Sequence, residues 1–317
     1  MFIDNLIDCI RKKNNPSVIG LDPRLEYLPE FIREKALKEY GPGLEGAAQA
    51  ILCFNKRIID AVSDIVPAVK PQAAYYEMYG IEGLRVFLET IEYAKSKGLL
   101  VIADAKRNDI GSTAEAYSSA FLGRVKIPGV GDKAVFDADA VTVNPYFGID
   151  GIKPFIEDCK NYDKGIFILV KTSNKSSGQL QDLLIYEGKS IYEIVAEHVE
   201  DWGKSLIGKY GYSSVGAVVG ATYPNQAKIL RKIMKQAYIL VPGYGAQGGT
   251  ARDAAHSFDS DGLGAIVNAS RSVMCAYQSD TWKETFSAEG FDEAARAEAI
   301  RMRDELYEAI SMNGVKK

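Results

Sequence analysis

Short apolar runs alternate with longer amphipathic segments along this chain, and this alternation constrains the fold more than any other feature. Each run is rich in Val, Ile and Ala and lacks period-two alternation, as expected for a strand buried on both faces of a parallel sheet. The eight runs are Ser17–Leu21, Ile65–Lys70, Leu99–Ala105, Ala140–Asn144, Gly165–Val170, Val215–Gly220, Tyr238–Val241 and Ala265–Asn268.

Amphipathic segments with helical spacing lie between these runs. Examples are Gly83–Lys97, Ile191–Ile207 and Asn225–Gln236, and a last one covers Ala294–Ile310. About eight strand–helix units in succession predict an α/β fold, a (β/α)8 TIM barrel with parallel strands rather than a doubly wound sheet. No low-complexity linker divides the sequence, so we expect one domain over residues 1–317 with helical insertions.

Composition and charge exclude several classes of function. The chain has 38 Lys and Arg against 42 Asp and Glu, so it has no basic excess with which to hold nucleic acid. No apolar stretch approaches the roughly 18 residues of a membrane span. The N-terminus is acidic early and basic late, which is not the pattern of a secretory signal. Apolar residues recur there at helical spacing and predict an extra N-terminal helix; they are Phe2, Ile3, Leu6, Ile7 and Ile10.

The cysteines and histidines narrow the chemistry further. Cys9, Cys53, Cys159 and Cys275 form no CxxC motif, which indicates neither a disulfide frame nor a zinc site, and a cytoplasmic protein with buried thiols is expected. The chain has two histidines, which excludes a three-histidine metal site and disfavours Ser-His-Asp or Cys-His catalysis. We therefore expect the chemistry to depend on Lys and Asp.

Charged side chains stand at the ends of the second and third runs. In a barrel these ends converge on the face that carries the active site, although strands also end in polar residues simply because loops are solvated. Asp104 and Lys106 lie on one side of an extended strand, and Lys70 would be their neighbour at the usual strand spacing of about 4.8 Å. An alternating Lys–Asp–Lys–Asp cluster of Lys70, Asp104, Lys106 and Asp109 is predicted, with an ordinary surface salt bridge as the alternative. Asp109 follows just past the strand and could reach this site or that of a neighbouring subunit.

The segment VPGYGAQGG contains G-x-G-x-x-G, which is also a dinucleotide-binding pattern. That pattern requires a following strand ending in an acidic residue, whereas the next run ends in Asn268. The glycines are better explained as a phosphate-binding loop after the seventh strand, with Arg271 as a clamp after the eighth. A flexible loop with a surface arginine is the alternative.

Three other loops carry weaker signals. Lys171–Gln179 follows the fifth run and offers hydroxyl and amide groups that could recognise the edge of a heterocycle or cap the next helix. Asp22 in GLDPR is a candidate acceptor for a sugar hydroxyl, or part of an ordinary Asp-Pro turn. Gly129–Gly131 is assigned to a loop with no role.

Taken in order, the motifs GLDPR, VKPQAAYYE, DAKRNDIGST, TVNPYFG, GATYP and VPGYGAQGG resemble the orotidine 5'-phosphate decarboxylase family, in its longer variety from bacteria and protists. The resemblance extends from about Asn14 to Tyr277. It implies a carboxy-lyase of de novo pyrimidine biosynthesis that converts orotidine 5'-monophosphate to uridine 5'-monophosphate and CO2 without a metal or organic cofactor. It also implies a homodimer whose active sites are shared between subunits.

The resemblance assigns roles to the charged residues. Lys106 would donate the proton to C6 of the pyrimidine, and Asp104 would lie against the departing carboxylate. Lys70 would orient Asp104 and, with Asp22, touch the ribose. Asp109 is the fourth member of the charged set and would be contributed to the other subunit's site.

The remaining implied contacts are with substrate. Thr113 would accompany Asp109 into the partner's site, near the ribose. Ser173 matches the residue that reads the pyrimidine amide edge, although Thr172 is an alternative match. Gln247 and Arg271 match the phosphate grip, with Pro242 and Gly243 among the substrate-binding residues. The chain departs from many relatives at NASRS, where a glycine commonly precedes the arginine.

The chemistry of the implied reaction fits a Lys–Asp site. Loss of CO2 from C6 leaves a carbanion in the ring plane that no adjacent carbonyl delocalises, so a fixed cation such as Lys106 must stabilise it and then supply a proton. A metal-dependent sugar-phosphate decarboxylase or aldolase-like synthase is a rival, but it would carry an acidic metal ligand where this chain has Lys70. A barrel that binds a phosphate ligand without catalysis is a second rival, but none of the four charged residues has been lost.

Overall fold

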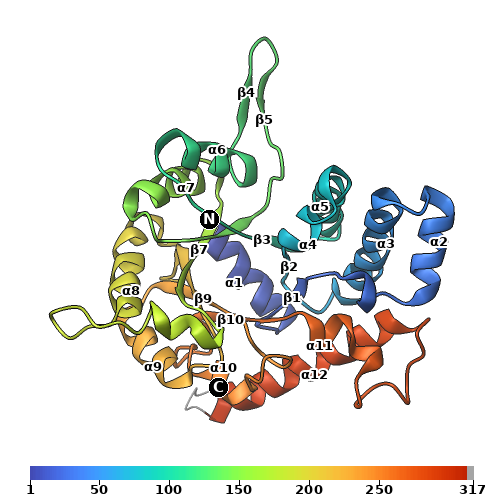
Figure 1. The fold of residues 1–317 in the computed structure, drawn as a ribbon. Helices are drawn as coiled ribbons and strands as arrows, with labels where there is room; N and C mark the ends of the chain where they lie inside the picture. Colours follow the sequence, from blue (N-terminus) through green and yellow to red (C-terminus); the bar gives the residue numbers. More distant parts are fainter. Residues whose placement is uncertain (313–317) are drawn as a thin grey trace.

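In the computed structural model, which describes residues 1–312, parallel strands close into a barrel surrounded by helices (Figure 1). Around the barrel the order is β1-β10-β9-β8-β7-β6-β3-β2. The strands are β1 Ser17–Leu21, β2 Ala68–Pro71, β3 Leu100–Arg107, β6 Ala140–Val143, β7 Gly165–Lys171, β8 Ser213–Val219, β9 Ala237–Val241 and β10 Ala265–Ala269. Each overlaps one of the eight predicted runs, so the predicted (β/α)8 barrel is confirmed. The predicted domain, residues 1–317, runs past the described residues at 313–317.

The helices alternate with the strands and bury one apolar face against them. The main ones are α3 Leu44–Val62, α5 Gly80–Ser96, α6 Gly111–Phe121, α7 Ile149–Tyr162, α8 Ile191–Trp202, α9 Pro224–Ile233, α10 Ala251–Ala255 and α12 Phe291–Met312. Shorter or peripheral elements are α2 Glu30–Tyr40, α4 Ala74–Glu77, α11 Arg271–Met274, η1 Leu25–Tyr27, η2 Lys175–Gln179, η3 Lys204–Leu206 and η4 Ala276–Gln278. The helix expected over Ile191–Ile207 is interrupted at Gly203, after which the chain continues as a 3-10 turn.

The predicted N-terminal helix is present as α1, Phe2–Lys13, and closes one end of the barrel. Its five apolar side chains pack into a cluster with inward-facing strand residues such as Ile102 and Phe167. The rings of Phe2 and Phe167 meet edge to face, with centroids 6.1 Å apart. Because α1 fills the N-terminal end of the barrel, a pocket inside it can open only at the C-terminal ends of the strands.

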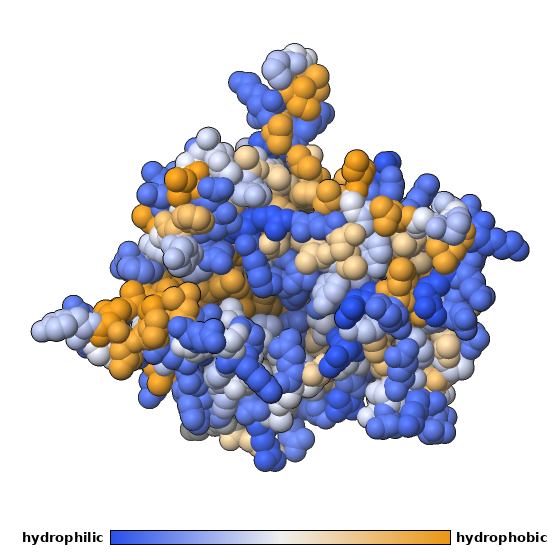
Figure 2. All heavy atoms as spheres, in the orientation of Figure 1, coloured by the Kyte–Doolittle hydropathy of each residue, from blue (hydrophilic) through white to orange (hydrophobic). Residues whose placement is uncertain are grey.

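Two segments project from the barrel. Gly129–Gly131, predicted as a loop, lies at the turn of a hairpin of β4 Val125–Ile127 and β5 Gly131–Lys133 (Figure 1, top). The loop prediction is confirmed for Gly129 and is wrong for Gly131, which begins β5, and the two strands are not predicted. Gly129 and Gly131 adopt φ of 77° and 103°, which glycine allows at little cost, and no residue of either strand is buried, so the sequence lacks a burial pattern there. The second segment lies between β7 and α8, and Figure 2 shows apolar side chains gathered over it; exposed ones are Leu180, Leu183, Leu184 and Ile185.

The cysteines only partly follow expectation. All four are free; Cys159 is buried, and Cys9 and Cys275 are half-buried. The expectation of buried thiols is wrong for Cys53, because this residue lies on a solvent-facing side of α3. Within residues 1–312, no helix combines the length and the apolar character needed to cross a bilayer.

Candidate active site

A pocket of about 360 Å³ opens at the C-terminal ends of the strands. Its lining includes Asp22, Lys70, Gln72, Asp104, Lys106, Thr142, Thr172, Ser173, Pro242, Gln247, Asn268 and Ser270. A second pocket of about 190 Å³ adjoins it beside the glycine-rich segment and Arg271, and the two share Asp22, Gln247, Asn268 and Ser270. Together they form an elongated site with a charged end and a glycine-rich end.

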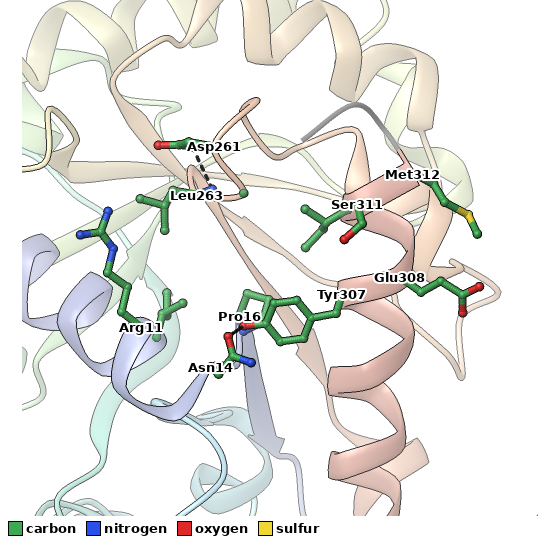
Figure 3. Close-up of a pocket in the computed structure, with 12 residues that line it drawn as sticks. Arg11, Asn14, Pro16, Asp261, Leu263, Tyr307, Glu308, Ser311 and Met312 are labelled. Carbon is green, nitrogen blue, oxygen red and sulfur yellow. Dashed lines mark hydrogen bonds between the residues drawn. The ribbon is translucent and has the colours of Figure 1, made fainter. Parts of the chain in front are cut away.

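A larger cavity, of about 940 Å³, lies at the opposite end of the barrel, between α1 and α12 (Figure 3). It is lined by residues such as Arg11, Asn14, Leu263 and Tyr307, and it contains none of the predicted site residues. The functional residues therefore belong to the smaller pair of pockets.

Asp104 stands at the centre of the charged end. Its Oδ2 atom is 2.6 Å from Nζ of Lys70, and its Oδ1 atom is 2.5 Å from Nζ of Lys106. Gln72 Nε2 donates to the same Oδ2 at 3.0 Å, and the Thr142 hydroxyl donates to Oδ1 at 2.9 Å. Each carboxylate oxygen thus accepts two hydrogen bonds, one of them from an ammonium group.

The interleaved contact of Lys70, Asp104 and Lys106 is the arrangement that strand spacing predicts. Gln72 and Thr142 were not predicted. Gln72 lies two residues after Lys70, so period-two alternation could have placed it on the same side. Thr142 sits on β6, and no local sequence pattern connects it to Asp104.

Opposite charges keep Lys70 and Asp104 ionised although both side chains are buried. The side chains of Lys70 and Asp104 are only 4% and 9% exposed, whereas that of Lys106 is 43% exposed. Burial alone would raise the pKa of Asp104, but Lys70 and Lys106 hold it well below its usual value. Burial alone would lower the pKa of Lys70, but Asp104 and Asp22 more than compensate and raise it. The carboxylate and the Lys70 ammonium are therefore charged at neutral pH.

Lys106 reaches Asp104 from an irregular backbone. Its φ is +50°, and the register between β3 and β6 shifts between Ala103 and Arg107. Its own amide donates to the Thr142 hydroxyl at 3.0 Å. Left-handed backbone at a lysine is strained, and such irregularities at strand ends redirect side chains at functional sites. The prediction of contact is confirmed, although the strand is not regularly extended at this residue.

Asp22 lies at the junction of the two pockets. Its Oδ1 is 4.0 Å from Nζ of Lys70 and is buried without a hydrogen-bond partner among the described residues. Burial raises the pKa of this carboxyl group, and Lys70 only partly offsets the effect. An unsatisfied buried oxygen at a pocket wall is suited to accept a hydrogen bond from a ligand hydroxyl.

The two ends of the site are joined by one hydrogen bond. The Ser173 hydroxyl donates to Gln247 Oε1 at 2.8 Å, so the loop after β7 meets the glycine-rich segment over the pocket. The Thr172 hydroxyl donates instead to the side chain of Asn174. Gly243 adopts a φ of +96°, and Arg271 is exposed beside it with Nη2 bonded to the Ala246 carbonyl. This end offers backbone and guanidinium donors suited to an anion.

Asp109 and Thr113 are not brought to this site, so within one chain the predicted alternating cluster is wrong for its fourth member, Asp109, which lies past the end of β3. The Asp109 carboxylate accepts the amide of Ile110, and Thr113 is exposed in the first turn of α6. Neither is among the described residues that line the two pockets. In the same part of the chain, residues 1–312, no group of three or more His, Cys, Asp or Glu side chains is arranged to hold a metal ion.

Comparison with known proteins identifies the family. The model of the orotidine 5'-phosphate decarboxylase / HUMPS family matches residues 19–283. A Caldicellulosiruptor bescii protein named orotidine 5'-phosphate decarboxylase is 43% identical over 310 residues, covering 98% of this chain and 99% of that protein. A Rhodopirellula baltica protein of the same name is 44% identical over 305 residues, covering 96% and 98%.

Solved structures agree. Leishmania donovani OMP decarboxylase has a TM-score of 0.73 at 29% identity, covering 98% of this chain and 99% of that one. Leishmania donovani UMP synthase has a TM-score of 0.73 at 31% identity. The alignment covers 98% of this chain and 56% of the UMP synthase chain. The chain therefore belongs to the orotidine 5'-phosphate decarboxylase family of carboxy-lyases.

Proposed function

We propose that this enzyme converts orotidine 5'-monophosphate to uridine 5'-monophosphate and CO2 without a metal or organic cofactor, as a step of pyrimidine biosynthesis. The observation that carries the proposal is the contact of Asp104 with two ammonium groups, at 2.6 and 2.5 Å, at the mouth of the barrel. The relatives named orotidine 5'-phosphate decarboxylase support the choice of substrate.

The substrate is proposed to lie along the paired pockets. Its phosphate would accept hydrogen bonds from Arg271, Gln247 and the amides near Gly243, at the glycine-rich end. The ribose would lie against Asp22 and Lys70, where the Asp22 oxygen that lacks a partner among the described residues accepts a hydrogen bond from a ribose hydroxyl. The pyrimidine amide edge would meet Ser173, and Pro242 also lines this pocket. This orientation directs C6 toward Asp104 and Lys106.

Decarboxylation then breaks the bond between C6 and its carboxylate carbon, and the electron pair stays on C6. The Lys106 ammonium stabilises this charge electrostatically and donates a proton to C6, giving the product. Neutral Lys106 afterwards regains its proton from solvent, because its side chain is partly exposed. Asp104 remains anionic, so it repels the substrate carboxylate more than the product-like state, while Lys70 holds it in position.

A homodimer with shared active sites is part of the proposal. Asp109 and Thr113 do not line the pocket of their own chain, so their proposed role near the ribose is in a partner's site. Exposed apolar side chains near these two residues suit a contact between subunits. Ile110 follows Asp109 directly, and Tyr146, Phe147 and Ile149 follow Asn144, whose carbonyl accepts a hydrogen bond from Asn108. A cytoplasmic location is also proposed, on the strength of the four unpaired cysteines.

The rival function is a metal-dependent reaction of a sugar phosphate on the same scaffold. It is disfavoured because Lys70 and Lys106 already occupy the space beside Asp104 that a cation would need. The proposed function and this rival are distinguished by incubating the enzyme with orotidine 5'-monophosphate and excess chelator, and measuring the formation of CO2 and uridine 5'-monophosphate. Full turnover with chelator is expected. A requirement for added Mg²⁺, or no turnover in either condition, would reject the proposal.

A further inference from the structure

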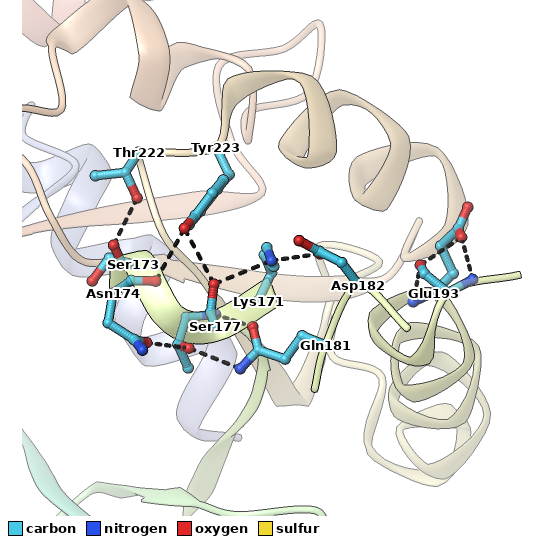
Figure 4. Close-up of polar contacts among 11 residues, drawn as sticks. Lys171, Ser173, Asn174, Ser177, Gln181, Asp182, Glu193, Thr222 and Tyr223 are labelled. Carbon is cyan, nitrogen blue, oxygen red and sulfur yellow. Dashed lines mark hydrogen bonds and ion pairs between the residues drawn. The ribbon is translucent and has the colours of Figure 1, made fainter. Parts of the chain in front are cut away.

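Lys171, the last residue of β7, places a buried ammonium group directly behind the loop that carries Ser173. Its side chain is 0% exposed, and Nζ lies 2.6 Å from Asp182 Oδ1 and 3.2 Å from the Ser177 hydroxyl (Figure 4). Nζ also lies 4.4 Å from the centroid of the Tyr223 ring. A buried cation is costly unless it is paired with an anion. The Lys171 ammonium therefore holds the carboxylate of Asp182, and with it the segment around Asp182, in place.

Asp182 belongs to the insertion Leu180–Lys189, whose contribution the sequence does not reveal. The insertion is itself anchored, because the Gln181 carbonyl accepts the amide of Tyr192 at 3.0 Å. Leu184 and Ser190 form an antiparallel bridge, and Ser190 begins α8 with a capping box. The segment around Gln181 and Asp182 is therefore fixed to α8 on one side and to Lys171 on the other.

Each residue of Thr172–Asn174 is held from outside the loop. The Thr172 amide donates to Gln181 Oε1 at 3.0 Å, and Gln181 Nε2 donates to the Thr172 hydroxyl at 2.8 Å. On the opposite side, the Thr222 hydroxyl donates to the Ser173 carbonyl at 3.0 Å, and the Tyr223 hydroxyl donates to the Asn174 carbonyl at 3.0 Å. The Ser173 hydroxyl is thereby left to face Gln247 over the pocket.

We propose that Gln181 and Asp182 are positioning residues that hold Thr172–Asn174 in the geometry that recognises the pyrimidine edge. Asp182 acts through Lys171, whereas Gln181 acts directly on the backbone of Thr172. The inference rests on the proposed function, because the ligand edge that Ser173 meets is that of a nucleotide base. Hydrogen-bond recognition weakens steeply when donor and acceptor are misaligned, and sites gain this alignment from supporting residues behind the contact.

The test compares a ligand that has a base with one that has none. Gln181→Met removes both hydrogen bonds to Thr172, keeps the side-chain length and leaves the Lys171–Asp182 pair intact. Inhibition by uridine 5'-monophosphate and by ribose 5-phosphate is measured on the folded full-length enzyme, alongside KM and kcat. We expect the inhibition constant for the nucleotide and KM to rise about tenfold, the value of about one hydrogen bond. The constant for ribose 5-phosphate should change less than about twofold.

Asp182→Asn is the second variant, since it neutralises the partner of Lys171 and should show the same selective loss. Tyr186→Ala is the matched control, because this side chain is fully exposed at the tip of the same insertion and should leave both constants unchanged. If Asp182→Asn does not fold, the Gln181→Met measurements alone decide whether the inference holds. Unchanged nucleotide inhibition in Gln181→Met, or an equal loss for both ligands, overturns the inference. Failure of the wild-type enzyme to turn over orotidine 5'-monophosphate would instead overturn the proposed function.

Discussion

Replacing Asp104 by Asn should destabilise the protein, because it removes the main counter-charge of a buried ammonium group. Lys70 is 4% exposed, and its Nζ lies 2.6 Å from Asp104. At an effective dielectric constant near 20, attraction over that distance is about 6 kcal/mol, and Asp22 at 4.0 Å retains about 4 kcal/mol in the variant. The Asn amide group would also point its hydrogens at two of the four donors that now surround the carboxylate.

The carboxylate's own desolvation offsets part of this loss. Removing one partner of a buried ion pair typically costs about 3–5 kcal/mol, and the remaining attraction of Asp22 favours the lower end, about 3 kcal/mol. With an unfolding entropy of about 2.1 cal/mol/K per residue over 317 residues, this corresponds to a melting temperature lower by about 4–5 °C.

Thermal unfolding followed by circular dichroism, at one fixed protein concentration, measures the change. The control is the double variant Lys70→Met/Asp104→Leu, which removes both charges of the pair and should abolish activity. It should recover only part of the stability, because buried Asp22 then loses its Lys70 partner. If Asp104→Asn melts at or above the wild-type temperature, the cluster is a net source of strain in the free enzyme and the electrostatic reasoning is refuted.

Three further predictions follow from the same site. The pKa of Asp104 is lower in the folded protein than in the unfolded chain, where it is near 3.9. The contribution of the Asp104 carboxylate to protein stability is therefore complete above that unfolded value and is lost as the pH falls toward the folded value. The difference in unfolding free energy between wild type and Asp104→Asn should thus be constant from about pH 7 to 5 and should shrink below about pH 4. A difference that grows on acidification would contradict this prediction. Mixing Asp109→Ala and Lys106→Ala chains should restore about a quarter of wild-type activity through hybrid dimers with one intact site, whereas reassociated hybrids without activity would exclude shared sites. Arg271→Ala should raise KM for the nucleotide about 10–100-fold, which is the value of one charge-assisted contact. Turnover of orotidine, which lacks the phosphate, should be unaffected. An equal loss for orotidine would exclude the phosphate role of Arg271.

The barrel and the core of the charged cluster are predictable from the sequence for physical reasons. Strands buried on both faces require continuous apolar runs, and their polar ends must converge when the sheet closes. Strand spacing predicts that Lys70 lies beside Asp104, and strand alternation predicts that Lys106 does so too, although Lys106 makes this contact from irregular backbone. The irregular backbone at Lys106 is not predictable, because its positive φ depends on the register with β6 and on the Thr142 hydroxyl.

The residues that support the site are the hardest to predict. Gln181 lies nine positions after Thr172 in the chain, and no periodic pattern connects the two. The β4–β5 hairpin escapes prediction for a related reason, since strands exposed on both faces have no apolar alternation. A buried Lys171 is equally unexpected, because a lysine at a strand end is normally solvated and only Asp182 and its neighbours explain its burial.

Measurement of kcat and of uridine 5'-monophosphate binding in Lys106→Met is the most direct test of the central claim, that a fixed ammonium beside Asp104 stabilises the charge developing at C6. Methionine keeps much of the side-chain length but carries neither charge nor proton. The account predicts that kcat falls by about 10⁴-fold or more, the combined value of electrostatic stabilisation and proton donation. Product binding should weaken by less than about tenfold. A Lys106→Met enzyme that retains kcat within about tenfold of wild type would contradict the account.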